Sequence, residues 1–471
     1  MTDVLLELGR NPQARRVLKA LGLPIPLPQA LRRDRGPWTA RPLADRCAVV
    51  GASAGAELVG VIAECLTAAG ADPFVSMPAE LAEAFRAPGE TFGRPARPLD
   101  TLDRSADIVV LDATGLRDPE ALRRLFDFFH PLVGKLARSG RVLVLGRPSA
   151  GLEPAAAAAQ GALDGFVRSV AKEIGRVGAT ANLVLVDPDA HRRLGPVLRF
   201  VLSDRSAFVT AQPLHVTARA HAIDEPALVR PLEKKIALVT GCARGIGEAT
   251  ARLLAQEGAH VVCLDRPADQ GPTSQLARAI GGTPLLVDLA GAGAPVAVAA
   301  ALQALGGADV VVHNAGVTRD KTLGRMTPEQ WDAVLGVNLA AVVRTQTAID
   351  PLLRDGGRVV CLSSIAGLAG NVGQSAYAAS KAGIVAYVRA QADRGAARGI
   401  TVNAIAPGFI ETRLTAAIPL HIREVARRLS ALGQGGLPED VAQAIVFLSS
   451  PGAQGITGCT LRVCGGAFVG A

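Results

Sequence analysis

Short apolar runs alternate with longer amphipathic stretches along most of this chain. In the first half, Val, Ile and Leu fill consecutive positions at 47–51, 108–112, 141–146 and 182–187. Unbroken apolar runs are typical of strands in a parallel sheet, which is buried on both faces. The stretches between them, such as 57–69 and 158–176, repeat apolar residues with a helical period. Residues 45–217 are therefore predicted to form a doubly wound α/β domain.

A second set of apolar runs begins near Lys234 and predicts a second α/β domain, over residues 234–471. Its predicted strands are 236–240, 260–265, 284–288, 309–313, 358–363 and 401–405. Residues 218–233 contain two prolines and mixed charge and are predicted to be a linker. Residues 1–44 are predicted to be an arm, in which a helical stretch at 5–21 is ended by a proline-rich segment.

The two sets of runs resemble each other in the same order along the chain. The pairs are 106–113 with 308–315, 140–145 with 357–362, 178–185 with 399–406, and 209–216 with 456–463. Four matches in one order point to an internal duplication. The alternative is two unrelated α/β domains whose strands have similar composition. The predicted fold class is α/β with two Rossmann-like parallel-sheet domains, of which the first is degenerate and flavodoxin-like.

Composition and charge narrow the classes of partner. The chain has 471 residues and a net charge of +8, but its basic residues are scattered rather than gathered in a block, so no nucleic acid partner is expected. Its seven cysteines include no CxxC pair, which predicts reduced thiols, a cytoplasmic protein and no metal site. Acidic Asp3 and Glu7 argue against a signal peptide, and no apolar run is long enough to span a membrane.

Candidate chemistry is concentrated between Ser364 and Lys381. Tyr377 lies thirteen residues after Ser364 and four before Lys381. Positions i and i+4 share a helix face, so the lysine ammonium is expected beside the tyrosine phenol. A nearby positive charge favours the phenolate and is expected to lower the pKa of Tyr377 from its usual value of about 10. With the Ser364 hydroxyl holding a substrate oxygen, this set suits proton transfer to or from a carbonyl or alcohol.

The first copy lacks these groups. In the aligned repeats, Ala156 stands opposite Tyr377, Gln160 opposite Lys381, Arg147 opposite Ser364 and Asp112 opposite Asn314. Its glycine turn, at 51–55, is also shorter. The first domain is therefore predicted to be catalytically silent and kept for packing or for partner binding.

A glycine turn opens the second copy at 239–247, between a predicted strand and a predicted helix. Gly241, Gly245 and Gly247 would permit the tight turn and a close approach of the backbone to a pyrophosphate at the helix N-terminus. Asp265 ends the next strand, where its carboxylate can bind the adenosine ribose hydroxyls and repel a 2′-phosphate. NADH is therefore the preferred cofactor.

Two arginines leave NADPH open as the alternative. Arg244 lies in the glycine turn and Arg266 follows Asp265. A guanidinium group can pair with a 2′-phosphate.

Taken together, these residues resemble the short-chain dehydrogenase/reductase family. The matching segments are TGCARGIG at 240–247, Asp288–Leu289, HNAG at 313–316, Asn338, Ser364, Tyr377–Lys381 and PGFIET at 407–412. They span residues 234–471 in the family's order and spacing. Within the family the segments at 371–384 and 403–412 look typical of bacterial 3-oxoacyl-[acyl-carrier-protein] reductases. A degenerate N-terminal domain is similar to the high-molecular-weight branch, which is described as NADH-preferring.

The resemblance implies roles for four catalytic residues. Tyr377 would be the general acid, Lys381 would lower its pKa and bind the nicotinamide ribose, Ser364 would hold the substrate carbonyl, and Asn338 would hold a water for proton resupply. The implied cofactor-binding residues are Gly241, Arg244, Gly245, Ile246, Gly247, Asp265, Asp288, Leu289, Asn314, Ala315, Gly316, Tyr377, Lys381, Pro407, Gly408, Ile410 and Thr412.

The implied reaction is NADH-dependent reduction of a 3-oxoacyl thioester, carried on acyl-carrier protein or CoA, as in fatty-acid synthesis. Arg354 and Arg398 are implied to dock the acidic carrier, although Arg354 is displaced by one residue from the family pattern. The loop at 410–420 is apolar and suits an acyl chain. The alternatives are a family member acting on another ketone or secondary alcohol, and a scaffold protein with two silent domains. A homodimer is expected.

Overall fold

The computed structural model describes residues 3–11, 13, 16, 20, 27–76, 79–222, 226–416 and 418–467. Its contacts divide the chain into two compact units. Unit 1 comprises Met1–Thr217, Ile418–Gly435 and Gly465–Phe468, and unit 2 comprises Ala218–Ala417, Gly436–Cys464 and Val469–Ala471. Residues 418–435 thus group with unit 1, whereas the sequence analysis assigned them to the second domain together with the rest of 234–471.

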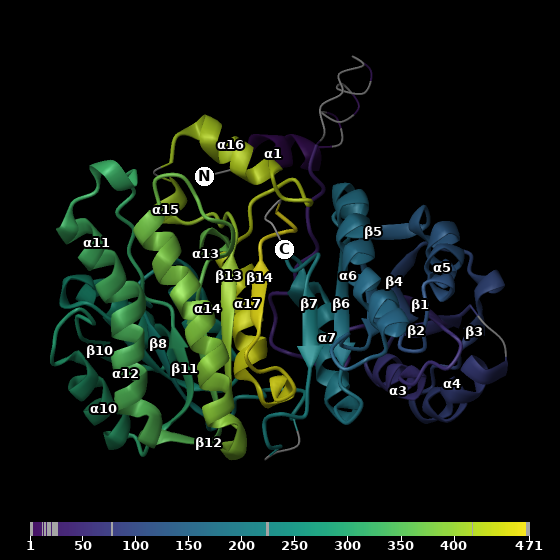
Figure 1. The fold of residues 1–471 in the computed structure, drawn as a ribbon, viewed down its shortest axis with the longest axis horizontal. Coiled ribbons are helices and arrows are strands. Elements are labelled where there is room, and N and C mark those ends of the chain that lie inside the picture. The colour runs from purple at the N-terminus through teal and green to yellow at the C-terminus, as the bar shows by residue number, and fades with distance from the viewer. Residues whose placement is uncertain are drawn as a thin grey trace. The chain divides into compact units, whose positions relative to one another are not determined.

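Unit 1 contains a seven-stranded parallel sheet in the order β3-β2-β1-β4-β5-β6-β7 (Figure 1). The strands are β1 (Cys47–Ala52), β2 (Asp72–Val75), β3 (Arg97–Pro98), β4 (Ala106–Asp112), β5 (Leu136–Gly146), β6 (Thr180–Val186) and β7 (Pro213–Val216). β3 is only two residues long. Without β3 the order is that of a flavodoxin-like sheet, and with it that of a Rossmann sheet.

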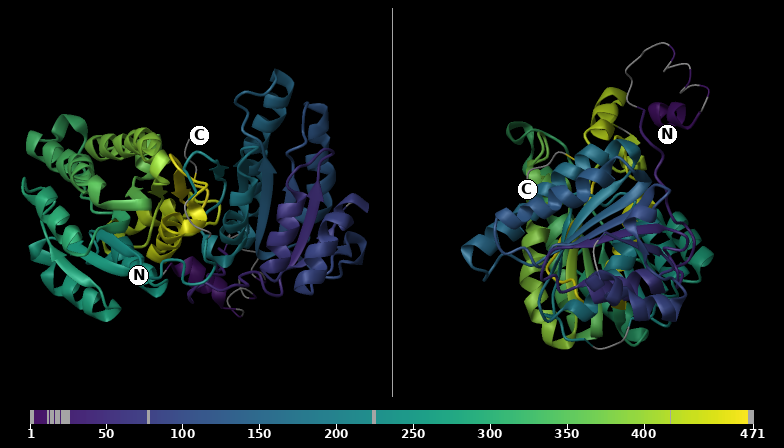
Figure 2. Two further views of the ribbon diagram at one scale, coloured as in Figure 1. Left: turned by 90° about the horizontal axis from the view of Figure 1, so that it is seen from below. Right: turned by 90° about the vertical axis from the view of Figure 1, so that its right-hand side faces the viewer.

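Helices lie on both faces of this sheet (Figure 2). On one face the aromatic side of α5 (Arg123–Val133) and the aliphatic side of α6 (Pro154–Ile174) form a core with the strands. α3 (Val59–Ala68) packs against α7 (Leu194–Leu202) and α4 (Ala79–Phe92). Unit 1 also contains α1 (Val4–Arg10) and α16 (Leu420–Arg428). Part of the stretch predicted to be helical at 5–21 lies outside the described residues.

Unit 2 has a second seven-stranded parallel sheet in the order β10-β9-β8-β11-β12-β13-β14. The strands are β8 (Ile236–Thr240), β9 (His260–Asp265), β10 (Thr283–Leu286), β11 (Ala308–His313), β12 (Leu353–Leu362), β13 (Thr401–Pro407) and β14 (Thr460–Val463). The helices are α8 (Gly245–Gln256), α9 (Gln270–Ile280), α10 (Ala294–Ala304), α11 (Pro328–Leu335), α12 (Ala341–Ile349), α13 (Ile365–Ala369), α14 (Ser375–Gly395), α15 (Arg413–Ala416) and α17 (Pro438–Ser449).

The predicted class, two Rossmann-like α/β domains, is confirmed. Every predicted strand is present, and 236–240 and 260–265 have the predicted bounds. No strand was predicted at β2 or β3, and β7 and β14 were recognised only within the repeated runs 209–216 and 456–463. β2 and β3 are short, and β3 is exposed, so neither produces a buried apolar run in the sequence.

Matching polar networks in the two units favour an origin by duplication. The guanidinium of Arg141 in β5 donates to Ser203 O, and that of Arg358 in β12 donates to Ser450 O. Likewise, Asn182 in β6 and Asn403 in β13 each donate to the backbone of the segment before the last strand. Both sheets also shift register at the same place, near the start of β4 and of β11. Strand composition alone would not reproduce these contacts.

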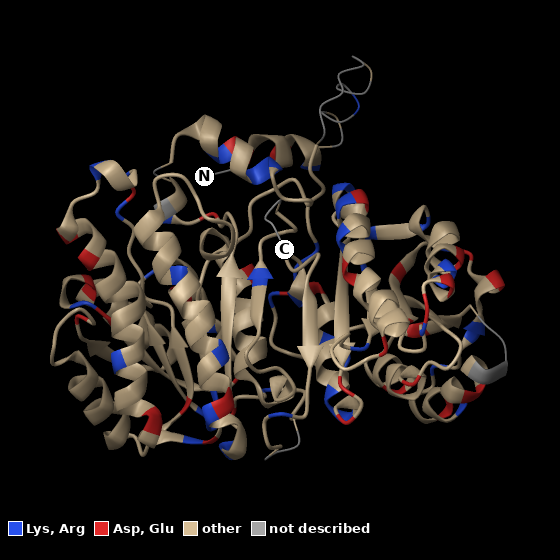
Figure 3. Ribbon diagram, in the orientation of Figure 1, with Lys and Arg blue, Asp and Glu red and all other residues tan. Residues whose placement is uncertain are grey.

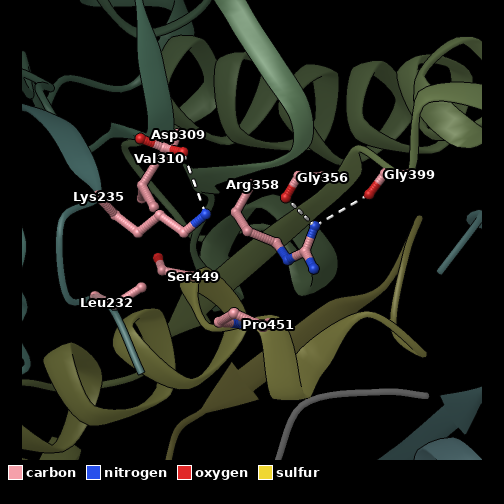
Figure 4. Close-up of a pocket in the computed structure, with 9 residues that line it drawn as sticks. All are labelled: Leu232, Lys235, Asp309, Val310, Gly356, Arg358, Gly399, Ser449 and Pro451. Atoms are coloured by element: carbon pink, nitrogen blue, oxygen red, sulfur yellow. Dashed lines mark hydrogen bonds and ion pairs between the residues drawn. The ribbon is translucent and has the colours of Figure 1, made fainter. Parts of the chain in front are cut away.

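Arg358 borders a small cavity where the strands of unit 2 begin (Figure 4). The cavity has a volume of about 20 Å³, enough for a water molecule. Lys235 pairs with Asp309 at 3.5 Å on one side, and Arg358 donates to Gly399 O at 3.0 Å on the other. With its charges paired or bonded to backbone, this cavity has a structural role.

Acidic and basic residues are interspersed over the ribbon, without a single-sign stripe (Figure 3). Within the part of the chain that the structure describes, no helix is both long and apolar enough to cross a membrane. Among the same residues, no three His, Cys, Asp or Glu side chains gather as a metal site would require.

Candidate active site

The first two turns of α14 carry Tyr377 and Lys381, and Ser364 is the second residue after β12. Because the strands are parallel, these groups meet at the edge of the sheet where the strands end. The Lys381 ammonium lies 5.7 Å from the centre of the Tyr377 ring, and Nζ donates to Leu362 O at 2.6 Å. The predicted serine, tyrosine and lysine are therefore brought together.

Burial controls the pKa values of this group. It raises the pKa of Tyr377, and the hydrogen bond with Ser364 lowers it only in part. The expected lowering of the Tyr377 pKa by Lys381 is wrong for this structure, because desolvation outweighs the favourable contacts. Burial also lowers the pKa of Lys381 to about 8, since the ammonium has lost most of its water. Tyr377 is thus a protonated phenol at neutral pH, as a proton donor must be.

The neighbouring serines have different environments. Ser363 is buried, and its Oγ donates to the backbone oxygen of Lys381 at 2.8 Å, which ties the end of β12 to α14. Ser364 is partly buried at the N-terminus of α13, where its Oγ accepts the N–H of Ala366 at 3.2 Å. The Ser364 O–H hydrogen is left for Tyr377 or a substrate, which supports the choice of Ser364 over Ser363.

Asn338 lies in a π-helical turn, Gly336–Ala340, between α11 and α12. Such turns often occur at functional sites. Its Oδ1 accepts the N–H of Val317 at 2.8 Å, and its Nδ2 donates to Val317 O at 3.0 Å and to Ser380 Oγ at 3.2 Å. A Cβ on Gly316 would lie 3.3 Å from Asn338 Oδ1 and 3.5 Å from Lys381 Nζ. Asn338 and Lys381 therefore both lie beside Gly316, close to each other.

The glycine turn has the geometry of a dinucleotide cradle. Gly241 and Gly245 adopt φ values of +67° and +63°, which favour glycine. A Cβ on Gly247 would lie 2.1 Å from Gly241 O, so only glycine allows α8 to approach this closely. The Asn314 amide donates to Thr240 O and Gly241 O and braces the turn. A pyrophosphate fits at the N-terminus of α8, which begins at Gly245.

Asp265 ends β9 beside this turn. One carboxylate oxygen accepts the N–H of Ala243 at 2.8 Å, and the other accepts the N–H of Arg266 at 2.9 Å. The carboxylate is thus fixed beside the turn, where a ribose hydroxyl can still reach its remaining lone pairs.

A second carboxylate, Asp269, was not singled out from the sequence. It is buried and forms ion pairs with both Arg244 and Arg266, the latter at 2.6 Å. Hydrogen bonds from Arg266 and Arg244 keep its pKa below the usual range despite the opposing effect of burial. Its position three residues after Arg266 is the sequence signal that could have revealed it.

The remaining cofactor candidates lie along the same edge of the sheet. Asp288 and Leu289 follow β10, and Ala315 and Gly316 follow β11. A Cβ on Gly245 would lie 3.9 Å from the Thr412 methyl carbon, so the segment after β13 reaches the glycine turn. The other predicted members of this segment are Pro407, Gly408 and Ile410, and Ile246 belongs to the first turn of α8.

Arg354 and Arg398 lie at the opposite edge, where the strands begin. Arg354 is the second residue of β12 and pairs with Asp309 at 2.8 Å. Arg398 precedes β13 and pairs with Asp355 at 2.8 Å. Both border one open depression. The length of β12 separates them from Ser364, about 30 Å at roughly 3.3 Å per residue. The structure therefore does not bring the two arginines to the catalytic residues of the same chain.

The corresponding region of unit 1 is filled by its own side chains. Gln160, in the position of Lys381, donates to Ala113 O and Leu116 O at 3.0 Å. Its Oε1 accepts the N–H of Arg147 at 2.8 Å, and the Arg147 guanidinium pairs with Glu57. Gln160 has no titratable group, so it cannot replace Lys381 in proton transfer.

Comparison with known proteins supports the assignment of unit 2. A family model described as enoyl-(acyl carrier protein) reductase matches residues 241–467. The 3-oxoacyl-[acyl-carrier-protein] reductases of Vibrio cholerae and Thermotoga maritima are 39% and 41% identical over 246 and 252 residues, 50% of this chain and 99% of each relative. An acetoacetyl-CoA reductase of Synechocystis is 42% identical over 240 residues, 50% of this chain and 96% of the relative.

These matches, with the fold and the site, show that the chain belongs to the short-chain dehydrogenase/reductase family, a class of NAD(P)H-dependent oxidoreductases. Within the family it is an enzyme of the 3-oxoacyl-[acyl-carrier-protein] reductase type. The predicted family and enzyme class are confirmed. Each of these relatives matches half of the chain, so unit 1 has to be understood from its own residues.

Proposed function

We propose that this protein reduces 3-oxoacyl thioesters to 3-hydroxyacyl thioesters with NADH. The observation that carries the proposal is the grouping of Tyr377 with Ser364 and Lys381, in which the Lys381 ammonium lies 5.7 Å from the centre of the Tyr377 ring. Burial raises the pKa of Tyr377, so the phenol is available as a proton donor. A reductase needs such a donor, because the carbonyl oxygen gains negative charge as hydride arrives at the carbon. The nicotinamide, when bound, supplies that hydride.

Each residue of the site has a part in this reaction. The Ser364 hydroxyl donates a hydrogen bond to the substrate carbonyl, and Tyr377 transfers its proton to the oxygen. Lys381 then stabilises the phenolate through its charge, because Nζ is close to the ring. Asn338, fixed to Val317 and Ser380, holds the water through which the proton is restored.

The preference for NADH rests on two carboxylates. Asp265 is fixed beside the glycine turn, where it would repel a 2′-phosphate. Asp269 pairs with both arginines that could otherwise bind that phosphate, Arg244 and Arg266. Two cations therefore offer little net positive charge to the cofactor. We accordingly propose NADH over NADPH.

The acyl group can be carried in two ways. Relatives of similar identity include reductases named for acyl-carrier protein substrates and one named for acetoacetyl-CoA. A thioester on either carrier presents the same ketone to Tyr377, so both are proposed substrates, in a fatty-acid-synthesis type of reaction. The second candidate function is reduction of an unrelated ketone or oxidation of a secondary alcohol, since the same proton transfer would serve either.

Loss of NADH absorbance in the presence of acetoacetyl-CoA tests the proposed function. We expect turnover with NADH, slower turnover with NADPH, and a loss of about 10²-fold or more in Tyr377→Phe, because the variant lacks the acidic proton. If the enzyme reduces other ketones but neither acetoacetyl-CoA nor acetoacetyl-carrier protein, the second candidate function, action on an unrelated ketone or secondary alcohol, is established. Full activity of Tyr377→Phe would refute the mechanism.

Carrier docking at Arg354 and Arg398 is a separate proposal. Because these arginines lie at the far edge of the sheet from Ser364, a carrier bound there would have to deliver its acyl group to the site of a second copy. We propose this together with a homodimer, and a cytoplasmic location from the free cysteines.

Arg398→Glu tests the docking role. It should raise the KM for carrier-bound substrate and leave the KM for a small β-keto ester unchanged. An equal change for both substrates would contradict docking.

A further inference from the structure

Cys242 and Cys263 lie together beside the glycine turn, within unit 2. Cys263 is in β9, Cys242 is the second residue after the neighbouring strand β8, and both side chains are completely buried. Their thiols form a hydrogen bond with each other. The proposed reaction uses neither of them. Two thiols in contact are therefore present beside the cofactor turn without an assigned role.

The backbone holds the two cysteines close to each other. The N–H groups of Gly241 and Cys242 both donate to Leu264 O, at 2.8 and 3.3 Å, and Leu264 directly follows Cys263. A disulfide can join two cysteines only where their backbones are within about 7 Å and their side chains point toward each other. The contact at Leu264 brings the backbones together, and the hydrogen bond between the thiols shows that the side chains face each other.

The pair is on the same face of the sheet as Asp265. Cys263 and Asp265 are two residues apart in β9, so their side chains point to the same face. On that face Asp265 accepts the N–H of Ala243 at 2.8 Å, which places the residue next to Cys242 over β9. A movement of Cys242 toward Cys263 would therefore shift Ala243 relative to Asp265, the carboxylate proposed to bind the ribose.

The two thiols differ in acidity. The hydrogen bond from Cys242 lowers the pKa of the Cys263 thiol and outweighs the opposing effect of burial, and the charge of Arg252 on α8 lowers this pKa further. The same hydrogen bond, together with burial, raises the pKa of Cys242. Because the thiolate is the reactive form of cysteine, Cys263 is the nucleophile of the pair and Cys242 is the thiol that attacks next.

An oxidant can reach the pair through the glycine turn. Gly241 is half-buried and Arg244 is exposed, so the pair lies just below an exposed stretch of the chain. Hydrogen peroxide is little larger than water, and a local opening of the turn is sufficient for its entry. NADH bound on the turn would cover this route.

We propose that Cys242 and Cys263 are an oxidation site, at which hydrogen peroxide forms a disulfide that weakens the binding of NADH. This inference rests on the proposed function, in which the glycine turn binds that cofactor. Formation of the bond draws residue 242 toward β9, so the backbone of residues 241–243 moves from the position that suits the pyrophosphate and Asp265. The two cysteines act on binding through the turn and do not touch the reacting atoms.

The oxidation has two steps. The Cys263 thiolate attacks one oxygen of hydrogen peroxide, an S–O bond forms as the O–O bond breaks, and the released hydroxide takes up the proton that Cys263 had lost. The Cys242 sulfur then attacks the sulfenic sulfur of Cys263. The S–S bond forms as the S–O bond breaks, and the Cys242 proton leaves with the hydroxyl group as a second water. The two thiols lose two electrons, and one peroxide becomes two water molecules.

Peptide mapping by mass spectrometry and NADH fluorescence test the proposal on the full-length protein. Hydrogen peroxide should join the peptides that contain residues 242 and 263, and a thiol reductant should separate them. We expect the Kd for NADH to rise about tenfold or more on oxidation, as loss of one charge-assisted hydrogen bond would produce, and to return on reduction. Excess NADH should slow the formation of the disulfide, because binding and oxidation oppose each other.

Cys263→Ala and Cys459→Ala are the matched variants, each compared with its own untreated form. Cys459 is the only one of the seven cysteines that is not buried. Peroxide should leave NADH binding by Cys263→Ala unchanged and should weaken binding by Cys459→Ala as in the wild type. Cys242→Ala lacks the other sulfur and should resist peroxide as well, so the test does not depend on one variant. The reverse pattern, with Cys459→Ala alone resistant, would overturn the proposal.

Two further results would overturn it: a disulfide that forms without a change in NADH binding, and no disulfide at these positions in excess peroxide. Failure of the proposed function has a different signature, in which the untreated enzyme reduces no 3-oxoacyl thioester. Peptide mapping and NADH binding need no thioester, so they still decide whether the pair is an oxidation site.

Discussion

At the scale of the residue, the buried charge of Lys381 is needed for the proposed reaction but lowers the stability of the folded protein. Its side chain is buried and its charged form faces one backbone oxygen, Leu362 O, at 2.6 Å. Burial lowers its pKa from 10.5 to about 8. Burial therefore favours the neutral amine over the ammonium that the proposed reaction needs.

The sign of the pH effect follows from that shift. The folded pKa of Lys381 is below the unfolded one, so between pH 8 and 10.5 the unfolded chain binds more protons and stability rises with pH. Lys381→Met removes the charge and the dependence. We expect the variant to be inactive yet more stable at pH 7 by roughly 2–3 kcal/mol, a gain that disappears near pH 10.5. Denaturant unfolding at several pH values measures it, and a less stable variant at pH 7 would contradict it.

Asp269 pairs with both arginines near the glycine turn, Arg244 and Arg266. Asp269→Asn removes the partner of Arg244 and Arg266, so both guanidinium groups become available to a 2′-phosphate. We expect kcat/KM with NADPH, relative to NADH, to rise about tenfold, mainly through KM, as gain of one charge-assisted hydrogen bond would produce.

The controls for this prediction keep or remove charge nearby. Asp269→Glu should retain the wild-type ratio. Glu248→Gln, which loses an ion pair with Arg252 on α8, changes net charge equally and should also leave the ratio unchanged. A ratio that stays constant in Asp269→Asn would show that Asp269 serves stability alone.

At the scale of the element, α8 depends on Gly247 for a close contact with the end of β8. The helix approaches β8 so closely that a Cβ on Gly247 would meet Gly241 O and, at 2.6 Å, the Asn314 amide. That amide is the one that braces the turn. The glycine turn, the start of α8 and Asn314 at the end of β11 therefore pack directly against one another.

Gly247→Ala should therefore weaken NADH binding by more than about tenfold, as tryptophan fluorescence or the KM for NADH would reveal, since the turn must open to admit the methyl group. Gly271→Ala in α9 is the comparison, because nothing lies within 4 Å of an added Cβ there. It should leave NADH binding intact and add roughly 0.5–1 kcal/mol of stability. Equal NADH binding in both variants would exclude the packing explanation.

At the scale of the whole molecule, the two units share one sheet topology. Each has a seven-stranded parallel sheet in the same order and a buried arginine that donates to the backbone. Unit 2 has the proton donor and the glycine turn, whereas Gln160 and Arg147 occupy the equivalent place in unit 1. The two units share a network of backbone contacts made by a buried arginine and a buried asparagine, as the predicted duplication would produce.

This division predicts different effects for the two buried arginines. Arg141→Met and Arg358→Met each leave buried carbonyl groups without a donor, which costs roughly 2–4 kcal/mol. By calorimetry we expect each variant to lower the melting temperature of its own unit. At temperatures near the transition, Arg358→Met should reduce NADH binding more than Arg141→Met does. Identical effects of both on NADH binding would mean that the units melt together.

The sequence by itself determined the fold class and most of the strands, and it predicted the residues of the catalytic group. Strands buried on both faces need unbroken apolar runs, and a turn that binds a dinucleotide needs glycine. The strand and turn at 236–247 can therefore be predicted without a structure. The spacing of Ser364, Tyr377 and Lys381 is likewise local to a strand end and one helix. These properties depend on neighbours in the chain.

Only the tertiary structure decided the rest, because it depends on groups distant in sequence. Burial among several elements reversed the expected shift of the Tyr377 pKa, and no local pattern records that environment. The sequence shows that Arg398 is basic. Its location at the edge of the sheet where the strands begin, opposite Ser364, follows from the direction of the strands in the folded sheet. The attachment of 418–435 to unit 1 joins Arg428 to Asp3 across 425 positions, a contact that periodicity cannot reveal.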